Sequence, residues 1–392
     1  MKEGWEYKKL GEVCEKAKNI KWEEHPNQQY KYIDLSAVDR LKHRVLSTVS
    51  INSTNAPSRA KQIVKDGDVL FATTRPTLKR LVIVDKSLHE QICSTGFCVL
   101  RPNKEKIESS WLYYILSDQS FYNYIEPLQK GASYPAVTDM QVKSYLIPIP
   151  PLSEQHRIVS YLDAAFAKID AVAKNAEDAL KEAKALFQSA LTKMMEPKEG
   201  WEYKKLGEVC QKTINIKWDE HPNHQYKYID LSAVDRMTHK VMSTTSICSI
   251  DAPSRAKQIV NEGDVLFATT RPTLKRLVII DKSLDGQICS TGFCVLRPTP
   301  AAIMSSWLYY ALSNQSFYNY IEPLQKGASY PAVTDNQVKS YKIPVPPLSD
   351  QRHIVSYLDV FKSKVDQLQS NRTRTLSECA ALKQSILRQT FE

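Results

Sequence analysis

The stretch Ile147-Pro148-Ile149-Pro150-Pro151-Leu152-Ser153-Glu154-Gln155 decides the fold, because it separates two kinds of sequence. Its prolines disrupt a helix, and each one pushes the preceding residue into an extended conformation. Ser153 is a favourable N-cap residue, so we expect a helix to start there. From Ser153 to about Met195 the chain contains neither proline nor glycine. The stretch therefore predicts a folded domain before it and one long helix after it.

This junction returns 196 residues later, as Ile343 to Gln351, and the rest of the chain repeats with it. At this offset, 142 of 196 aligned positions are identical. Residues 1–152 match 197–348 at 123 of 152 positions, whereas the tails 153–196 and 349–392 match at only 19 of 44. The period is far too long for a solenoid of short repeats. We therefore expect two closely copied domains, each followed by a diverged helical spacer.

Apolar residues recur at steps of three and four along both tails, which is typical of a coiled-coil seam. In the first tail they are Ile158, Leu162, Ala165, Ile169, Val172, Ala176, Leu180, Ala183, Phe187, Leu191 and Met194. In the second tail they are Ile354, Leu358, Phe361, Val365, Leu368, Leu376, Leu382 and Ile386. Each helix would be roughly 64 Å long at 1.5 Å per residue.

A copied domain lies between these two helices in the sequence, so we expect the helices to pair antiparallel. Such a pair brings the chain termini together and relates the copied domains by an approximate two-fold axis, one at each end of the rod. Two separate helices, each docked on its own domain, are the alternative.

The copied domain has the pattern of a mixed α/β fold, and the whole chain is predicted to be α+β. Short β-branched and aromatic runs predict strands at 30–35, 68–73 and 81–84. Asp66-Gly67-Asp68 predicts a turn before the second of these strands. The run Ser109 to Leu116 combines a serine cap with helical spacing and predicts a helix.

The formal charge of +10 is concentrated in the copied domains, which carry +5 and +4, whereas the tails carry −1 and +2. Two basic domains are expected to face a polyanion such as nucleic acid, but an ordinary basic surface would give the same count. The sequence contains neither a long apolar run nor a secretory signal pattern, so a cytoplasmic protein without a membrane span is expected. The pairs Cys93/Cys98 and Cys289/Cys294 lack neighbouring metal-ligand pairs, which favours buried thiols and no metal.

The order domain, helix, domain, helix resembles the specificity subunit of type I restriction-modification systems. The resemblance rests on the opening Trp5-Glu6-Tyr7-Lys8-Lys9-Leu10-Gly11 and on the junction I-P-I/V-P-P-L-S-E/D-Q-x-x-I-V, present twice. It covers essentially the whole chain.

The resemblance implies that residues 1–152 and 197–348 are target recognition domains, each reading half of a split site in double-stranded DNA. The helices would set the spacing and dock two DNA methyltransferase (modification) subunits, and a restriction/translocase subunit would complete the complex. S-adenosylmethionine and ATP are then expected only on those partner subunits, and no cofactor on this chain.

The similarity of the two domains departs from the common family pattern, in which the two recognition domains differ. Near-identical readers related by a two-fold axis should read near-identical half-sites in inverted orientation. We therefore predict a nearly palindromic, interrupted target. Residues 1–196 contain one reader and one helix, so this half alone is predicted to dimerise and to recognise the same palindrome.

The first candidate DNA-contact segment is Thr73 to Arg80, which returns intact as Thr269 to Arg276. It follows a predicted strand and combines a proline-set turn with arginines, a lysine and hydroxyl groups, which can bind base edges or phosphates. A surface loop with incidental charge is the alternative. The candidate residues are Thr74, Arg75, Thr77, Lys79 and Arg80, with Thr270, Arg271, Thr273, Lys275 and Arg276 in the second copy.

The second candidate segment is Lys130 to Thr138, repeated as Lys326 to Thr334. Its glycine permits close approach of the backbone to DNA, and its alternative is a purely structural turn. The candidate residues are Lys130, Ser133 and Tyr134, with Lys326, Ser329 and Tyr330; Arg59, Lys61, Arg255 and Lys257 are further candidates for phosphate contacts. The copies differ most at 41–55 against 237–251, for example Lys42/Thr238, which marks either a half-site difference or a drifting loop.

No catalytic motif supports an enzyme. The pairs Pro150-Pro151 and Pro346-Pro347 lack the Asn or Asp before them and the aromatic residue after them that an adenine methyltransferase requires, and no phosphate-binding loop is present. Asp66 and Asp68 are more typical of a turn than of a nuclease site. A stand-alone DNA-binding regulator and a duplicated protein-binding scaffold are the alternatives to a non-catalytic specificity subunit.

Overall fold

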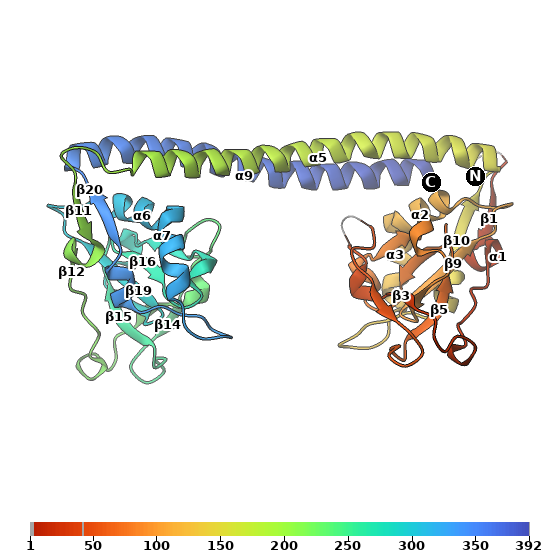
Figure 1. Ribbon diagram of the computed structural model, residues 1–392, viewed down its shortest axis with the longest axis horizontal. Helices are drawn as coiled ribbons and strands as arrows, with labels where there is room; N and C mark the ends of the chain where they lie inside the picture. Colours follow the sequence, from red (N-terminus) through yellow and green to blue (C-terminus); the bar gives the residue numbers. More distant parts are fainter. Residues whose placement is uncertain (1–3, 41–42, 392) are drawn as a thin grey trace. The chain divides into compact units, whose positions relative to one another are not determined.

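The computed structural model describes residues 4–40 and 43–391, so Lys42 lies outside the described residues (Figure 1). The chain divides into two compact units. Unit 1 contains residues 1–176 and 373–392, and unit 2 contains residues 177–372. Each unit therefore holds one copied domain together with a piece of each long helix.

The described part of unit 1 contains two four-stranded sheets and a two-stranded ribbon. The antiparallel sheet has the order β2-β9-β6-β7, with strands Cys14–Glu15, Phe97–Pro102, Val69–Ala72 and Leu81–Ile83. The mixed sheet has the order β4-β3-β8-β5, with strands Val49–Ile51, Tyr30–Ile33, Gln91–Ser94 and Ala60–Val64. In this sheet β3 and β8 pair in parallel. The ribbon joins β1 (Glu6–Lys9) to β10 (Leu146–Ile149).

Short helices cover the antiparallel sheet of unit 1 and build its core. They are α1 (Leu10–Val13), α2 (Ser109–Ser117), α3 (Gln119–Ile125) and α4 (Asp139–Lys143). Trp111 on α2 is fully buried, and its Nε1 donates to the carbonyl of Pro148 at 3.1 Å. Phe71 on β6 meets Phe121 on α3 edge to face, with ring centroids 5.0 Å apart. These large aromatic side chains supply much of the buried apolar area that holds helices and sheet together.

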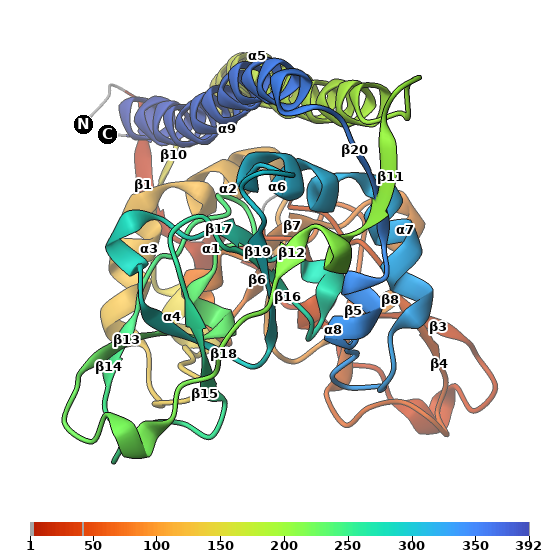
Figure 2. The same cartoon turned by 90° about the vertical axis from the view of Figure 1, so that its left-hand side faces the viewer.

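Unit 2 repeats this arrangement. Its sheets have the orders β12-β19-β16-β17 and β14-β13-β18-β15, and its ribbon is β11-β20. The first sheet consists of β12 (Cys210–Gln211), β19 (Phe293–Pro298), β16 (Val265–Ala268) and β17 (Leu277–Ile279). The second sheet consists of β14 (Thr245–Ile247), β13 (Tyr226–Ile229), β18 (Gln287–Ser290) and β15 (Ala256–Val260). The ribbon consists of β11 (Glu202–Lys205) and β20 (Lys342–Val345). The covering helices are α6 (Ser305–Ser313), α7 (Gln315–Ile321) and α8 (Asp335–Lys339). Figure 2 shows β11 and β20 side by side below the long helices.

The long helices are α5 (Leu152–Met194) and α9 (Leu348–Phe391). Helix α5 begins at Leu152 rather than after Ser153, because the carbonyl of Pro151 already accepts hydrogen bonds from the backbone N–H groups of Glu154 and Gln155. Ser153 is thus a residue of the first turn and not the N-cap. Ser109 likewise lies inside α2, whose N-cap is Glu108, and its hydroxyl donates to the carbonyl of Gly67 at 2.7 Å.

Gln155 fixes α5 to the domain of unit 1. Its side chain is fully buried, and its Nε2 donates to the carbonyls of Lys106 and Pro150, both at 2.9 Å. Its Oε1 accepts from the backbone N–H of Glu108 at 3.0 Å. Gln351 makes the same three bonds at the start of α9. The junction residues therefore set the direction in which each helix leaves its domain.

In unit 1 the end of α9 runs antiparallel beside the start of α5. Cys379 contacts the carbonyl of Ile169, whereas Leu387 packs in one cluster with Ile158 and Leu162. Residues near the two ends of the chain meet here, since Trp5 and Phe391 both pack edge to face against Trp111.

In unit 2 the end of α5 pairs antiparallel with the start of α9. Arg372 contacts Glu177, and Phe187 packs against Phe361 at 5.5 Å. Leu191 shares a cluster with Ile354 and Leu358. The expected antiparallel helix pairing is therefore present in both units.

Most seam residues of both helices are shielded, but three are not. Leu376 and Ile386 are half-buried, and the following are buried: Ile158, Leu162, Ile169, Leu180, Leu191, Ile354, Leu358 and Val365. Val172 is 53% exposed, and Leu368 and Leu382 are exposed as well, so their assignment to the seam was wrong. At each of these three places the following residue, such as Ala173 or Gln369, is the more shielded one. After Ile169, for example, the shielded residues follow a step of four and then a step of three, whereas the sequence pattern assumed three and then four.

Candidate DNA-binding surface

The segment after β6 forms a tight turn with a strained backbone. Arg75 and Lys79 flank a 3₁₀ turn, Pro76–Leu78, and both adopt the left-handed conformation, with φ of 49° and 54°. This conformation is costly for side chains with a Cβ and persists only where other contacts impose it. The second copy repeats it at Arg271 and Lys275, with φ of 50° and 56°.

The two candidate segments, more than fifty residues apart in sequence, lie together. The backbone N–H of Arg75 donates to the carbonyl of Pro135 at 2.6 Å, and Thr74 forms a β-bridge with Ala136. Lys130 and Ala136 close the second loop with a pair of 2.9 Å backbone bonds. This loop turns at Gly131, whose φ is 101° and where a Cβ would lie 3.1 Å from the carbonyl oxygen of Tyr134.

Arg75 stands at the centre of this surface. Its Nη2 donates to the carbonyl of Ser133 at 3.0 Å, and its guanidinium lies 4.6 Å from the ring centroid of Tyr134. Tyr134 is 69% exposed, and Arg75 and Ser133 are exposed too. Stacking on an aromatic ring orients the planar guanidinium while leaving donors for a ligand. In the second copy, Arg271 contacts Ser329 at 3.0 Å and Tyr330 at 4.5 Å in the same way.

The turn between β8 and β9 holds the start of the first candidate segment through hydrogen bonds. The backbone N–H and the hydroxyl of Thr73 both donate to the carbonyl of Gly96. The N–H of the neighbouring Thr95 donates to the carbonyl of Arg59 at 2.9 Å. Arg59 and the exposed Thr95 therefore flank the turn that also holds Thr73. Thr95 was not among the residues selected from the sequence, because no charged residue stands beside it in the chain.

Lys79 and Arg80 point to a different environment. The Nζ of Lys79 donates to Oε1 of Gln119 at 2.8 Å and lies 4.6 Å from the ring centroid of Tyr122, so burial lowers the pKa of this ammonium. Arg80 is half-buried, and its Nε has no hydrogen-bond partner among the described residues. The ammonium of Lys79 is thus engaged with the protein. The other candidates, Thr77, Lys61 and Lys130, are exposed.

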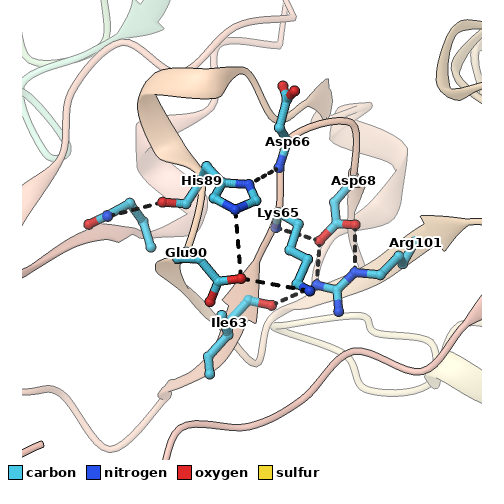
Figure 3. A network of polar contacts seen from close by, with 8 residues as sticks. Ile63, Lys65, Asp66, Asp68, His89, Glu90 and Arg101 are labelled. Carbon is cyan, nitrogen blue, oxygen red and sulfur yellow. Dashed lines mark hydrogen bonds and ion pairs between the residues drawn. The ribbon is translucent and has the colours of Figure 1, made fainter.

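The acidic turn that could suggest a nuclease is a structural element. Asp68 is 1% exposed, and Arg101 grips its carboxylate with Nε at 2.9 Å and Nη2 at 2.8 Å (Figure 3). Asp66 lies in the turn at Gly67, whose φ of 87° explains the glycine. A carboxylate neutralised in this way stabilises the fold and is not available for a metal or a water. Cys93 and Cys98 are also fully buried, and burial raises the pKa of both thiols.

Comparison with known proteins indicates the family of this chain, which contains the surface in both of its units. The family model described as "Type I restriction modification DNA specificity domain" matches residues 2–182 and again residues 198–377. The chain belongs to this family. It is a specificity subunit of the type I restriction-modification kind, as the sequence motifs indicated.

Similar specificity subunits match along nearly the whole chain. The specificity subunit of the type I restriction enzyme EcoKI from Escherichia coli is 23% identical over 424 residues, covering 99% of this chain and 89% of that protein. The StySPI specificity subunit from Salmonella potsdam is 22% identical over 418 residues, with the same coverage.

Solved structures share the fold of this specificity subunit. One, described as "Structural basis underlying complex assembly and conformational transition of the type I R-M system", is 32% identical, covers 100% of this chain and 98% of its own, and has a TM-score of 0.80. The crystal structure of the HsdS subunit from Thermoanaerobacter tengcongensis is also 32% identical, covers 100% and 97%, and has a TM-score of 0.56. No helix in the described part of the chain is both long and apolar enough for a membrane span.

Proposed function

We propose that this specificity subunit reads a bipartite, nearly palindromic site in double-stranded DNA, with one half-site contacted by residues 1–152 and the other by 197–348. The observation that carries the proposal is the repetition of one exposed arrangement. Arg75 stacked on Tyr134 and Arg271 stacked on Tyr330 share sequence, backbone strain and hydrogen bonds. Two readers with the same contact groups are expected to prefer the same bases.

In this proposal Arg75 makes the base contact. Its guanidinium can fork onto O6 and N7 of a guanine, which is a contact that distinguishes base pairs in the major groove. Thr77, Lys61 and Lys130 are exposed and would bind phosphates, which adds affinity without selecting a sequence. Lys79 would act indirectly, because its contacts to α3 hold the end of the turn that presents Arg75.

The partners are proposed from the family. The long helices α5 and α9 would dock two methyltransferase subunits, and a restriction/translocase subunit would join them. S-adenosylmethionine and ATP would bind to those subunits, and this chain would act without catalysis of its own. The protein would then work in the cytoplasm on double-stranded DNA.

The proposal is tested by mapping methylation on DNA exposed to this chain with its cognate methyltransferase. Arg75→Ala and Arg271→Ala, made separately, should each weaken recognition of one half-site by about 1–3 kcal/mol. Lys65→Asn is the matched control, because it also removes one positive charge and places there the residue that the second copy carries at Asn261. Two unrelated half-sites, or equal effects of all three changes, would contradict the proposal.

A further inference from the structure

The two long helices differ at several of the positions where they approach each other, and these differences follow a rule. Helix α5 carries phenylalanine at Phe166 and Phe187. The repeat offset assigns to these two positions Lys362 and Lys383 of α9. One helix therefore has the aromatic residue at both places, and the other has the ammonium at both.

In unit 1 the phenylalanine of α5 meets a lysine of α9. The Nζ of Lys383 lies 5.2 Å from the ring centroid of Phe166 and 2.6 Å from Oδ1 of Asp170. The ring of Phe166 packs edge to face against Tyr114 on α2, with centroids 5.4 Å apart. The lysine is thus satisfied by an aromatic face and a carboxylate, both supplied by α5.

In unit 2 the other phenylalanine of α5 and the other lysine of the pair on α9 lie at one cavity, and Phe187 also packs against Phe361 of α9 at 5.5 Å. Phe187 of α5 packs against Tyr310 at 6.3 Å, and Lys362 of α9 pairs with Asp366 at 2.7 Å. Both Phe187 and Lys362 line one cavity of about 330 Å³ between the helices and α6. Each unit therefore places one of these two phenylalanines of α5 near one of these two lysines of α9.

An ion pair across the seam follows the same rule. Glu177 of α5 and Arg372 of α9 pair at 2.8 Å. The repeat offset places Thr373 in α9 at the position of Glu177, and Ala176 in α5 at the position of Arg372. The acid is thus present only on α5 and the base only on α9.

We propose that these three pairs of positions form a pairing code, by which the seam of α5 selects an α9 and rejects a second copy of either helix. In an α9–α9 pair at this register, Lys362 would face Lys383 at both ends and the two Arg372 side chains would lie close together without an acid. In an α5–α5 pair, Asp170 would lose its ammonium and the two Glu177 side chains would approach each other. Unfavourable contacts in the wrong pairs are an effective source of specificity.

The consequence is that the chain closes on itself rather than pairing with another chain, although its two domains are nearly interchangeable. The dimer predicted for residues 1–196 alone would be an α5–α5 pair. The pairing code therefore predicts that this dimer is less stable than the α5–α9 pair of the full chain. The proposal concerns only the helices and does not depend on the DNA contacts proposed above.

A double-mutant cycle in the full chain tests the code. Phe166→Lys places a second ammonium beside Lys383 and should lower the thermal midpoint, whereas Phe166→Lys with Lys383→Phe exchanges the two groups and should restore most of the loss. Val172→Lys is the control, because it adds the same charge at an exposed position of α5. The single change should cost at least ~2–4 °C more than the control. Purely additive effects in the double variant would overturn the proposal.

A second experiment tests selection between chains and does not depend on one variant being stable. One chain carries Phe166→Lys, Phe187→Lys and Glu177→Arg, and the other carries Lys362→Phe, Lys383→Phe and Arg372→Glu. When the two variants are refolded together, native mass spectrometry should detect mixed dimers in several-fold excess over either homodimer. Mixed dimers no more abundant than those from two differently tagged wild-type chains would overturn the code.

Discussion

The copied domains and the long helices differ sharply in how far the two repeats agree, although they belong to the same chain. The domains are identical at 123 of 152 positions and the helices at 19 of 44. Every candidate DNA-contact residue falls in the closely copied part, and the turn of Arg75 and Lys79 keeps its backbone geometry in the second unit. The helices keep part of the buried seam, as at Leu162 and Leu358, but differ at other positions where they approach each other, as at Phe166 and Lys362. If both domains bind the same kind of half-site, as proposed, their contact residues have to agree, whereas helices that bind each other only need to be complementary.

The same contrast exists on a smaller scale inside the copied domain. In unit 1, Lys65, His89 and Glu90 form an exposed polar network beside the buried pair Asp68–Arg101 (Figure 3). The second copy replaces the three exposed residues by asparagine, aspartate and glycine but retains the buried pair as Asp264 and Arg297. Exposed ion pairs contribute little to stability, whereas breaking a buried pair leaves an uncompensated charge.

The largest expected effect comes from that buried pair. Asp68→Ala leaves the Arg101 guanidinium buried without its carboxylate and should lower the free energy of unfolding by about 3–5 kcal/mol. Glu90→Gly is the contrasting variant, since it installs the residue of the second copy at a position with φ of 56°. It should be neutral or stabilising by up to ~1 kcal/mol. Chemical denaturation measures both, and similar losses would remove the distinction between buried and exposed charges.

An intermediate effect is expected along the helix seam. Leu162 is fully buried and Val172 is 53% exposed, although both fit the apolar spacing of the sequence. Leu162→Ala should cost roughly 2–4 kcal/mol, and Val172→Ala less than about 0.5 kcal/mol. Thermal unfolding of the two variants checks this directly. A large loss for Val172→Ala would mean that the sequence pattern, and not the structure, gives the correct seam.

The smallest expected effect distinguishes the two units through pH. Burial lowers the pKa of His239 from its usual 6.5 to about 4, and its Nδ1 is hydrogen-bonded to the hydroxyl of Tyr309 at 2.9 Å. The unfolded chain therefore takes up a proton between these two values that the folded chain does not. Stability should fall as the pH drops from 6.5 towards 4 and should not depend on this group above 6.5.

His239→Asn suits the left-handed backbone there, with φ of 55°, and should remove part of this acid sensitivity. Because the imidazole is not fully buried, the contribution at pH 5 is expected to be about 1 kcal/mol. The measurement is the free energy of unfolding at pH 7 and pH 5, with and without the substitution. An unchanged difference between the two pH values would show that other groups dominate. Burial also lowers the pKa of the equivalent His43, which instead contacts the carbonyl of Leu81.

The repeat, the fold class and the two long helices could be predicted because their signals are local. Proline excludes helix at 147–151, and uninterrupted apolar spacing after it requires one. The antiparallel pairing also followed, since a domain separates the helices in the chain. Helix starts were less certain: Ser153 has the composition of an N-cap, but the carbonyl of Pro151 closes the first turn instead.

Only the tertiary structure decided which candidate residues act together. Arg75 and Tyr134 are 59 positions apart, and no sequence pattern indicates that the ring orients the guanidinium. Arg75 and Lys79 look equivalent in sequence, yet one is exposed and the other contacts Tyr122. The physical reason is that periodicity and turn chemistry act over a few residues, whereas side-chain exposure depends on which distant segments the sheets bring together.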